Sequence, residues 1–105
     1  MRTLEHLEKT IAERRTASPD ESYVASLNAK GVPKIAQKVG EEATEAVIAA
    51  VSGSNEELVS ESADLLFHLL VLLNAKDVPL KAVLAELDRR HGVSGIAEKA
   101  SRKEK

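Results

Sequence analysis

The chain has 105 residues, of which 43% are hydrophobic and 30% charged, and its formal net charge is −2. Its length fits one domain, and the near-balanced charge with one Tyr, one Phe and no Trp argues against a nucleic-acid-binding surface. Because it contains no Cys, it has no disulfides and no thiolate metal ligands, which fits a reducing cytoplasm.

The first predicted elements are two helices. Apolar residues recur at helical spacing over about 3–16, and the S-P-D-E segment that follows breaks the pattern. Ser18 or Asp20 can cap a short second helix, which Lys30-Gly31 should end.

Three longer helices are predicted next. Pro33 suits the first turn of a helix, and Ser54 with Glu57 three residues later forms a capping-box pattern. The remaining elements are expected at about 33–51, 54–74 and 77–90, followed by a C-terminal tail at about 93–105. The linkers are short, so neighbouring helices should be antiparallel, and the fold class is an all-α bundle of about five helices.

No segment resembles a targeting or membrane-spanning sequence. The N-terminal ten residues have mixed charge and no long apolar run, unlike a secretory signal. The longest apolar stretch, Leu65 to Leu73, is interrupted by His68 and is too short to cross a bilayer. We therefore expect no membrane association.

Two carboxylate clusters fall on the third and fourth predicted helices. An E-E-x-x-E and an E-x-x-D motif supply Glu41, Glu42, Glu45, Glu61 and Asp64. At about 100° per residue, Lys38 joins the first cluster on one stripe, and Glu57 and His68 join the second. The fourth helix is otherwise apolar around its circumference, which is typical of a central helix. Antiparallel packing would then place Glu61 and Asp64 opposite Glu42 and Glu45.

Such a group of acids needs a cation or protonation. Two carboxylates about 4 Å apart repel by roughly 4 kcal/mol at an effective dielectric of about 20. An all-oxygen ligand set favours Mg²⁺, with Mn²⁺ as a substitute, and Mg²⁺ usually completes its shell with water and phosphate oxygens. Lys38 and Lys34 precede the acids by one and two turns, respectively, and suit phosphate contact. The sequence therefore indicates metal-assisted phosphate chemistry.

Simpler interpretations exist for these residues. The glutamates could belong to a solvated helix face, and Lys34 and Lys38 could be their i,i+4 partners. His68 could be a hydrogen-bonded core or interface histidine, and Glu57 a capping residue. Arg89 and Arg90 lie at a predicted helix end, where solvated surface charge is the default.

At these residues the chain resembles a known family. The acid pattern is similar to that of the all-α nucleoside-triphosphate pyrophosphatase superfamily, which includes MazG-like enzymes and dimeric dUTPases. Longer segments resemble the phosphoribosyl-ATP pyrophosphohydrolase family. They are K-I-A-Q-K-V-G-E-E-A-T-E-A-V-I-A-A (34–50), E-S-A-D-L-L-F-H-L-L-V-L-L (61–73), S-Y-V-A-S-L (22–27), the turn at Lys30-Gly31 and G-V-S-G-I-A-E-K-A-S-R (92–102).

The resemblance implies a function. It is Mg²⁺-dependent hydrolysis of phosphoribosyl-ATP to phosphoribosyl-AMP and pyrophosphate, the cytoplasmic second step of L-histidine biosynthesis. It also implies a homodimer with sites near the subunit boundary. Residues 1–105 would form one pyrophosphohydrolase domain without the cyclohydrolase that some relatives carry, since the chain has no Cys for that enzyme's zinc site.

The resemblance also assigns residues to roles. Glu42, Glu45, Glu61 and Asp64 match the family's metal ligands. Glu41 matches the first acid of the motif, and it could be a ligand or could orient the attacking water. Lys38 is the preferred phosphate contact, with Lys34 as the second.

Two other functions compete with this one. The first is a housecleaning nucleoside-triphosphate pyrophosphatase of the MazG or dUTPase type, which the shared acid pattern allows. The second is a non-enzymatic helical dimerisation module with a structural acidic seam. Substrate turnover and metal dependence separate the three.

Overall fold

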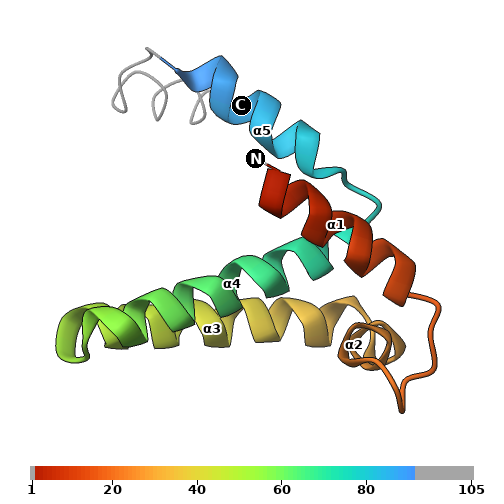
Figure 1. The fold of residues 1–105 in the computed structure, drawn as a ribbon, viewed down its shortest axis with the longest axis horizontal. Helices are drawn as coiled ribbons and strands as arrows, with labels where there is room; N and C mark the ends of the chain where they lie inside the picture. Colours follow the sequence, from red (N-terminus) through yellow and green to blue (C-terminus); the bar gives the residue numbers. More distant parts are fainter. Residues whose placement is uncertain (1, 92–105) are drawn as a thin grey trace.

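In the computed structural model, which describes residues 2–91, every regular element is a helix (Figure 1). The helices are α1 (Arg2–Arg14), α2 (Tyr23–Lys30), α3 (Val32–Ser52), α4 (Asn55–Ala75) and α5 (Leu80–Arg90). The all-α prediction with about five helices is confirmed, and each predicted segment overlaps an observed helix. The predicted tail at 93–105 lies outside the described residues.

Local chemistry explains the short helix α2. The side chain of Ser22, rather than Ser18 or Asp20 as predicted, caps it by accepting the N–H of Ala25 at 3.2 Å. Both alternatives lie too early, because a turn at residues 19–21 precedes the first helical residue. Gly31 ends the helix at φ 94°, a left-handed conformation that disfavours side chains, so the predicted glycine stop is confirmed.

The ends of α3 and α4 also follow their sequence signals. Pro33 lies in the first turn of α3. At the start of α4 the predicted capping box is present: Glu57 N–H donates to Ser54 Oγ at 3.1 Å, and Ser54 N–H donates to Glu57 Oε1 at 3.2 Å. Between the two helices, a Cβ on Gly53 would lie 3.0 Å from the carbonyl oxygen of Ala49. The tight turn therefore favours glycine, and it folds α4 back along α3.

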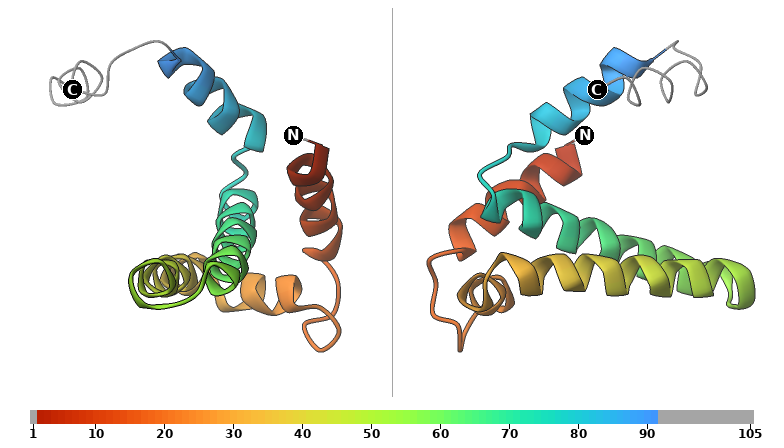
Figure 2. Two further views of the ribbon diagram at one scale, coloured as in Figure 1. Left: turned by 60° about the vertical axis from the view of Figure 1, so that its left-hand side comes forward. Right: turned by 180° about the vertical axis from the view of Figure 1, so that it is seen from behind.

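The antiparallel hairpin of α3 and α4 is the longest feature of the fold, and the other helices gather at one end of it (Figures 1 and 2). Helix α1 packs on α4, and α2 packs on α3. The buried core lies where these helices meet and consists of Ile11, Val24, Leu27, Ile35, Leu70, Val71 and Leu80. The hairpin extends beyond this core towards its turn.

Helix α1 and the residue that follows it stabilise the turn between α4 and α5. Arg15 Nη1 donates to the carbonyl oxygen of Asn74 and to Asp77 Oδ1, each at 3.0 Å. The N-cap position of α5 is a proline, which has no side-chain acceptor, and Glu8 Oε2 accepts the N–H of Leu80 at 2.7 Å instead. A distant carboxylate thus caps α5.

Large apolar side chains remain exposed along the hairpin. Val47, Ile48 and Val51 lie on α3, and Val59 and Leu66 lie on α4. Val51 is 81% exposed and Val59 71%, far more than a core position allows. This surface is an unpaired apolar face in the single chain.

Helix α4 is, within the described part of the chain, the one helix long and apolar enough to cross a membrane by length and composition. Core helices of globular proteins meet the same criterion, so the observation is weak by itself. Glu61 and Asp64 lie within the helix, and acidic groups in a membrane span are costly. Packing along α3 accounts for part of its apolar composition, while Val59 and Leu66 remain exposed.

Candidate metal and phosphate site

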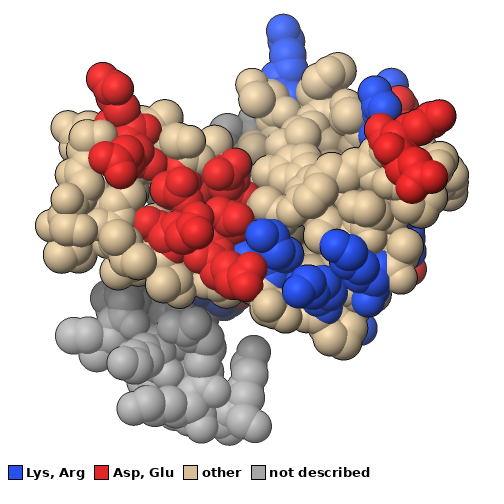
Figure 3. Space-filling view, turned by 90° about the horizontal axis from the view of Figure 1, so that it is seen from below, with Lys and Arg blue, Asp and Glu red and all other residues tan. Residues whose placement is uncertain are grey.

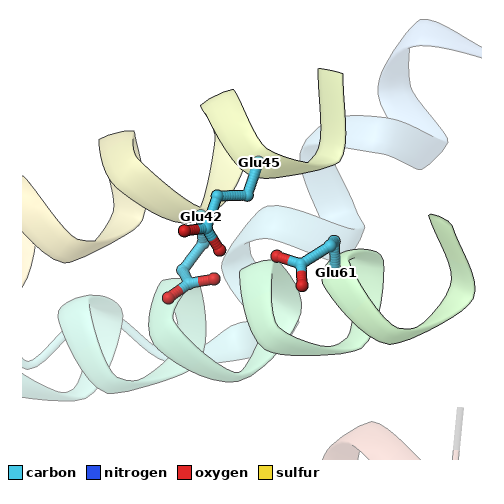
Figure 4. A group of neighbouring side chains, drawn as sticks. All are labelled: Glu42, Glu45 and Glu61. Atoms are coloured by element: carbon cyan, nitrogen blue, oxygen red, sulfur yellow. The ribbon is translucent and has the colours of Figure 1, made fainter. Parts of the chain in front are cut away.

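Three carboxylates from two helices converge on the α3–α4 seam (Figure 4). Glu42 and Glu45 come from neighbouring turns of α3, and Glu61 comes from the facing side of α4. One oxygen from each lies within 4.8 Å of the other two. The antiparallel hairpin predicted from the sequence thus brings these acids together, and we call them the acidic group.

Two oxygens of the acidic group have no protein partner. Glu42 is 8% exposed, and Glu42 Oε2 and Glu61 Oε2 are both buried without a hydrogen bond. A buried carboxylate oxygen without a partner is costly, whereas a hard cation would satisfy it. Three converging carboxylates also form the all-oxygen donor set that suits Mg²⁺ or Mn²⁺. The residues present therefore fit a divalent metal.

The crowding of these carboxylates shifts the pKa of Glu61. A hydrogen bond with Glu45, followed by burial and the charges of Glu45, Asp64 and Glu42, raises the pKa of Glu61 from 4.5 to about 7. A proton shared between Glu61 and Glu45 therefore relieves part of the repulsion when no cation does so.

The remaining two predicted acids lie at the edge of the acidic group. Asp64 is exposed and is not among the three converging residues, although its charge contributes to the raised pKa of Glu61. Glu41 is also exposed, and its Oε2 accepts a hydrogen bond from Gln37 Nε2 at 3.1 Å. That bond, aided by the charge of Lys38, lowers the pKa of Glu41 and keeps the carboxylate ionised.

Lys34 and Lys38 form what we call the cationic end of the seam, and Lys38 contacts the acids. Its Nζ lies 3.5 Å from Glu41 Oε1 and 3.7 Å from Glu42 Oε1, so it is the ion-pair partner that helical spacing allows. The electrostatic influence of Tyr23, then the charges of Glu41 and Glu42, raise the pKa of Lys38. Lys34 is half-buried, and its charge helps to lower the pKa of Glu41. On one face of the molecule acidic side chains border basic ones directly (Figure 3).

Two open grooves meet at Glu45. One, of about 810 Å³, runs along α3 and is lined by Gln37, Lys38, Gly40, Glu41, Glu42, Thr44, Glu45 and Ile48. The other, of about 370 Å³, lies towards the hairpin turn and is lined by Glu45, Ile48, Ala49, Ser52, Gly53, Glu57 and Glu61. The seam therefore offers room on both sides of the acidic group.

An aromatic group next to the seam was not predicted as a unit. His68 is 5% exposed and hydrogen-bonded, as its structural interpretation expects, and its partners are the Tyr23 hydroxyl and the carbonyl oxygen of Asp64. The Tyr23 ring also stacks on Phe67, with centroids 6.1 Å apart. The sequence places His68 on the acidic stripe of α4, which indicates that it lies near the acids. Helical periodicity within α4 cannot predict its contact with Tyr23 on α2.

Arg89 and Arg90 lie on α5, away from these acids in sequence, and both bind Glu86. Arg89 Nη2 and Arg90 Nε lie 2.8 and 2.9 Å from Glu86 Oε2. Their hydrogen bonds lower the pKa of Glu86 to about 2. The two arginines thus stabilise the end of α5, in keeping with the structural interpretation.

Comparison with known proteins decides the family. The model of the phosphoribosyl-ATP pyrophosphohydrolase family matches residues 4–91. The chain belongs to this family. The phosphoribosyl-ATP pyrophosphatase of Erythrobacter litoralis is 71% identical over 102 residues, which cover 97% of this chain and 98% of that protein.

Two further relatives agree. The phosphoribosyl-ATP pyrophosphatase of Novosphingobium aromaticivorans is 71% identical over 94% of this chain and 92% of its own length. That of Rhizorhabdus wittichii is 64% identical over 95% of this chain and 94% of its own length. The resemblance drawn from the sequence is confirmed, and the fold is consistent with the all-α MazG-like superfamily. The match lies in the phosphoribosyl-ATP branch rather than the housecleaning branch.

Proposed function

We propose that this chain hydrolyses the α–β phosphoanhydride of phosphoribosyl-ATP, giving phosphoribosyl-AMP and pyrophosphate in the second step of L-histidine biosynthesis. The observation that carries the proposal is the acidic group, with its two unpartnered buried oxygens beside Lys38, in a chain of this family. We place the reaction in the cytoplasm, with Mg²⁺ as the cofactor and Mn²⁺ as a substitute.

Glu42, Glu45 and Glu61 would hold the metal, and Asp64 is the fourth proposed ligand. The three converging carboxylates and their unpartnered oxygens support the first part of this assignment. Asp64 lies one turn of α4 beyond Glu61, and its charge helps to raise the pKa of Glu61. When bound, Mg²⁺ would polarise the phosphoryl group and lower the pKa of a bound water.

The chain's own side chains would orient the substrate and the water. Lys38 would donate to phosphate oxygens along the groove that reaches Glu45, and Lys34 is the second proposed phosphate contact. Water oxygen would bond to the α-phosphorus while the bond from that phosphorus to the bridging oxygen breaks, so that pyrophosphate leaves and the proton lost by the water passes to solvent. Glu41 is held ionised by Gln37 and Lys38, so it is better suited to orient a water by accepting its hydrogen bond than to remove its proton.

The test is a substrate panel assayed for pyrophosphate, with Mg²⁺, with Mn²⁺ and with a chelator. We expect pyrophosphate, rather than single phosphate, from phosphoribosyl-ATP and only with a divalent ion. Glu45→Gln and Asp64→Asn should each lower turnover by about 100-fold or more, with the helical circular dichroism retained. Glu56→Gln, an exposed acid on the same helix α4, is the matched control and should keep its turnover.

Two results would contradict this assignment. Full turnover in both Glu45→Gln and Asp64→Asn would show that these carboxylates do not form the active site. Rapid hydrolysis of dUTP or another nucleoside triphosphate, with none of phosphoribosyl-ATP, would move the chain to the housecleaning class.

We also propose that the chain works as a homodimer. The exposed apolar face of the hairpin supports this, because a second copy could cover Val47, Ile48 and Val51. Sedimentation should give a dimer mass at micromolar concentration, and Val51→Asp should shift it to the monomer. Ala12→Asp, an equal charge change at an exposed position of α1, should remain dimeric. A monomeric mass for the unchanged protein would refute the proposal.

A further inference from the structure

Tyr23 is an exposed aromatic side chain whose direction is fixed. The chain has one Tyr, one Phe and no Trp, and Phe67 is half-buried whereas Tyr23 is 50% exposed. The Tyr23 hydroxyl lies 2.8 Å from His68 Nε2, and the Tyr23 ring stacks on Phe67. The His68 ring meets the Tyr23 ring edge-on, with centroids 5.6 Å apart. An exposed ring held by these contacts offers a preformed surface to another flat group.

The bond to His68 places this ring near the acids of α4. Glu61, Asp64 and His68 share one stripe of the helix, and His68 Nδ1 lies 2.8 Å from the carbonyl oxygen of Asp64. His68 follows Glu61 by two turns, which is about 10 Å along the helix axis. The Tyr23 ring therefore lies within reach of a nucleotide whose phosphate is held at the acidic group.

The longer groove runs in the same direction. Helices α3 and α4 are antiparallel, and Glu45 meets Glu61 in the acidic group. Two turns further along α4, His68 is therefore about level with Lys38 on α3. The groove of about 810 Å³ is lined by Lys38 at this level and continues to Glu45. A nucleotide that extends along this groove from the acidic group would bring its base towards Tyr23.

We propose that Tyr23 binds the purine base of the substrate by stacking. The exposed part of the ring covers one face of the base, while the acidic group and its metal hold the phosphate to be attacked. Aromatic side chains suit this role because every base presents a flat π-face. This inference rests on the proposed function for the identity of the nucleotide. It requires only that a purine nucleotide lies in the groove.

The composition of the chain allows a direct assay. Since Tyr23 is the single Tyr and there is no Trp, the intrinsic tyrosine fluorescence of the protein comes from Tyr23 alone. The probes are AMP, which has a base, a ribose and a phosphate, and ribose 5-phosphate, which lacks the base, each with Mg²⁺. Free N-acetyltyrosinamide corrects for light absorbed by AMP. We expect saturable quenching by AMP and none by ribose 5-phosphate.

Two substitutions separate the ring from its hydroxyl. Tyr23→Leu removes the aromatic ring, whereas Tyr23→Phe keeps the ring and loses the bond to His68. We expect Tyr23→Leu to raise the KM for phosphoribosyl-ATP and the calorimetric Kd of AMP by about 5–100-fold, with kcat and the Kd of ribose 5-phosphate little changed. Tyr23→Phe should retain most of the affinity. Ser26→Ala, which removes another hydroxyl hydrogen bond on α2, is the control and should change none of these constants.

Equal losses of AMP and ribose 5-phosphate affinity in Tyr23→Leu would indicate a general structural role and would overturn the inference. So would an unchanged Kd of AMP in that variant, or no quenching of the unchanged protein by AMP. A Tyr23→Leu monomer, where the unchanged protein is a dimer, would assign the ring to the subunit interface instead. Quenching by AMP without turnover of phosphoribosyl-ATP would refute the proposed function alone, and turnover without quenching would refute this inference alone.

Discussion

Glu45 offers a direct test of the repulsion within the acidic group, because no cation pairs with it among residues 2–91. One carboxylate oxygen of Glu45 lies within 4.8 Å of one of Glu42. Two unit charges at that distance repel by about 3.5 kcal/mol at an effective dielectric of about 20. Glu45 is exposed, and solvent screens most of this energy. We expect Glu45→Gln to raise the free energy of unfolding of the metal-free protein by about 1 kcal/mol.

Glu42→Gln should behave differently although it lies one turn away. This change also removes the repulsion from Glu45, but it loses the attraction of Lys38 Nζ at 3.7 Å. At the same dielectric that attraction is about 4.5 kcal/mol, which offsets the repulsion. We therefore expect no net gain in stability from Glu42→Gln. Both variants should lose activity, so stability and turnover change independently.

The assay is urea unfolding at one protein concentration, followed by circular dichroism, with EDTA and then with Mg²⁺. A pH of about 8.5 keeps Glu61 ionised, since its pKa is about 7. Glu21→Gln, at an exposed position outside the helices, should stay within about 0.5 kcal/mol of the unchanged protein. With Mg²⁺ the unchanged protein should gain more stability than Glu45→Gln, because ligand binding favours the native state. A Glu45→Gln variant no more stable than the unchanged protein in EDTA would refute the reasoning.

Three further outcomes are expected. Glu61 has a pKa of about 7 in the fold against an ordinary 4.5, so the native state binds more protons than the unfolded state between these values. Without metal, its contribution to stability should therefore fall as the pH rises from about 4.5 to 7; a pH-independent difference in urea midpoint between the unchanged protein and Glu61→Gln would contradict this. Ser54→Ala should cost about 1 kcal/mol in urea unfolding because the α4 cap is lost, whereas Ser54→Thr should retain most of it. Glu8→Ala should cost about 1–2 kcal/mol because the N–H of Leu80 loses its acceptor, and an equal loss in Glu13→Ala on the same helix would show that the cap is not responsible.

The α3–α4 hairpin could be predicted from the sequence because its determinants are local. The Ser54 and Glu57 pair marks the start of a helix, and helical spacing alone puts Glu42 and Glu45 on one face. The short linker then leaves antiparallel pairing as the simple arrangement, and this brings in Glu61.

The remaining features depend on contacts between distant parts of the chain. Glu8 caps α5 from a position 72 residues away, and Tyr23 reaches His68 across 45 residues. A helical wheel treats all acids on one stripe alike, so it could not separate the half-buried Glu61 from the exposed Asp64. It also could not foresee that α1, α2 and the core gather at one end of the hairpin and leave Val51 and Val59 uncovered.

The placement of the acidic group on a single helical hairpin also bears on how the protein folds. All its members lie between Glu41 and Asp64, on two consecutive helices joined by one tight turn. Closing such a short loop costs little chain entropy, so pairing of α3 with α4 is among the fastest steps open to the chain. The contacts that join Ile11 to Leu80 need both ends of the chain and come later. During synthesis, the acidic group can therefore form before α5 leaves the ribosome.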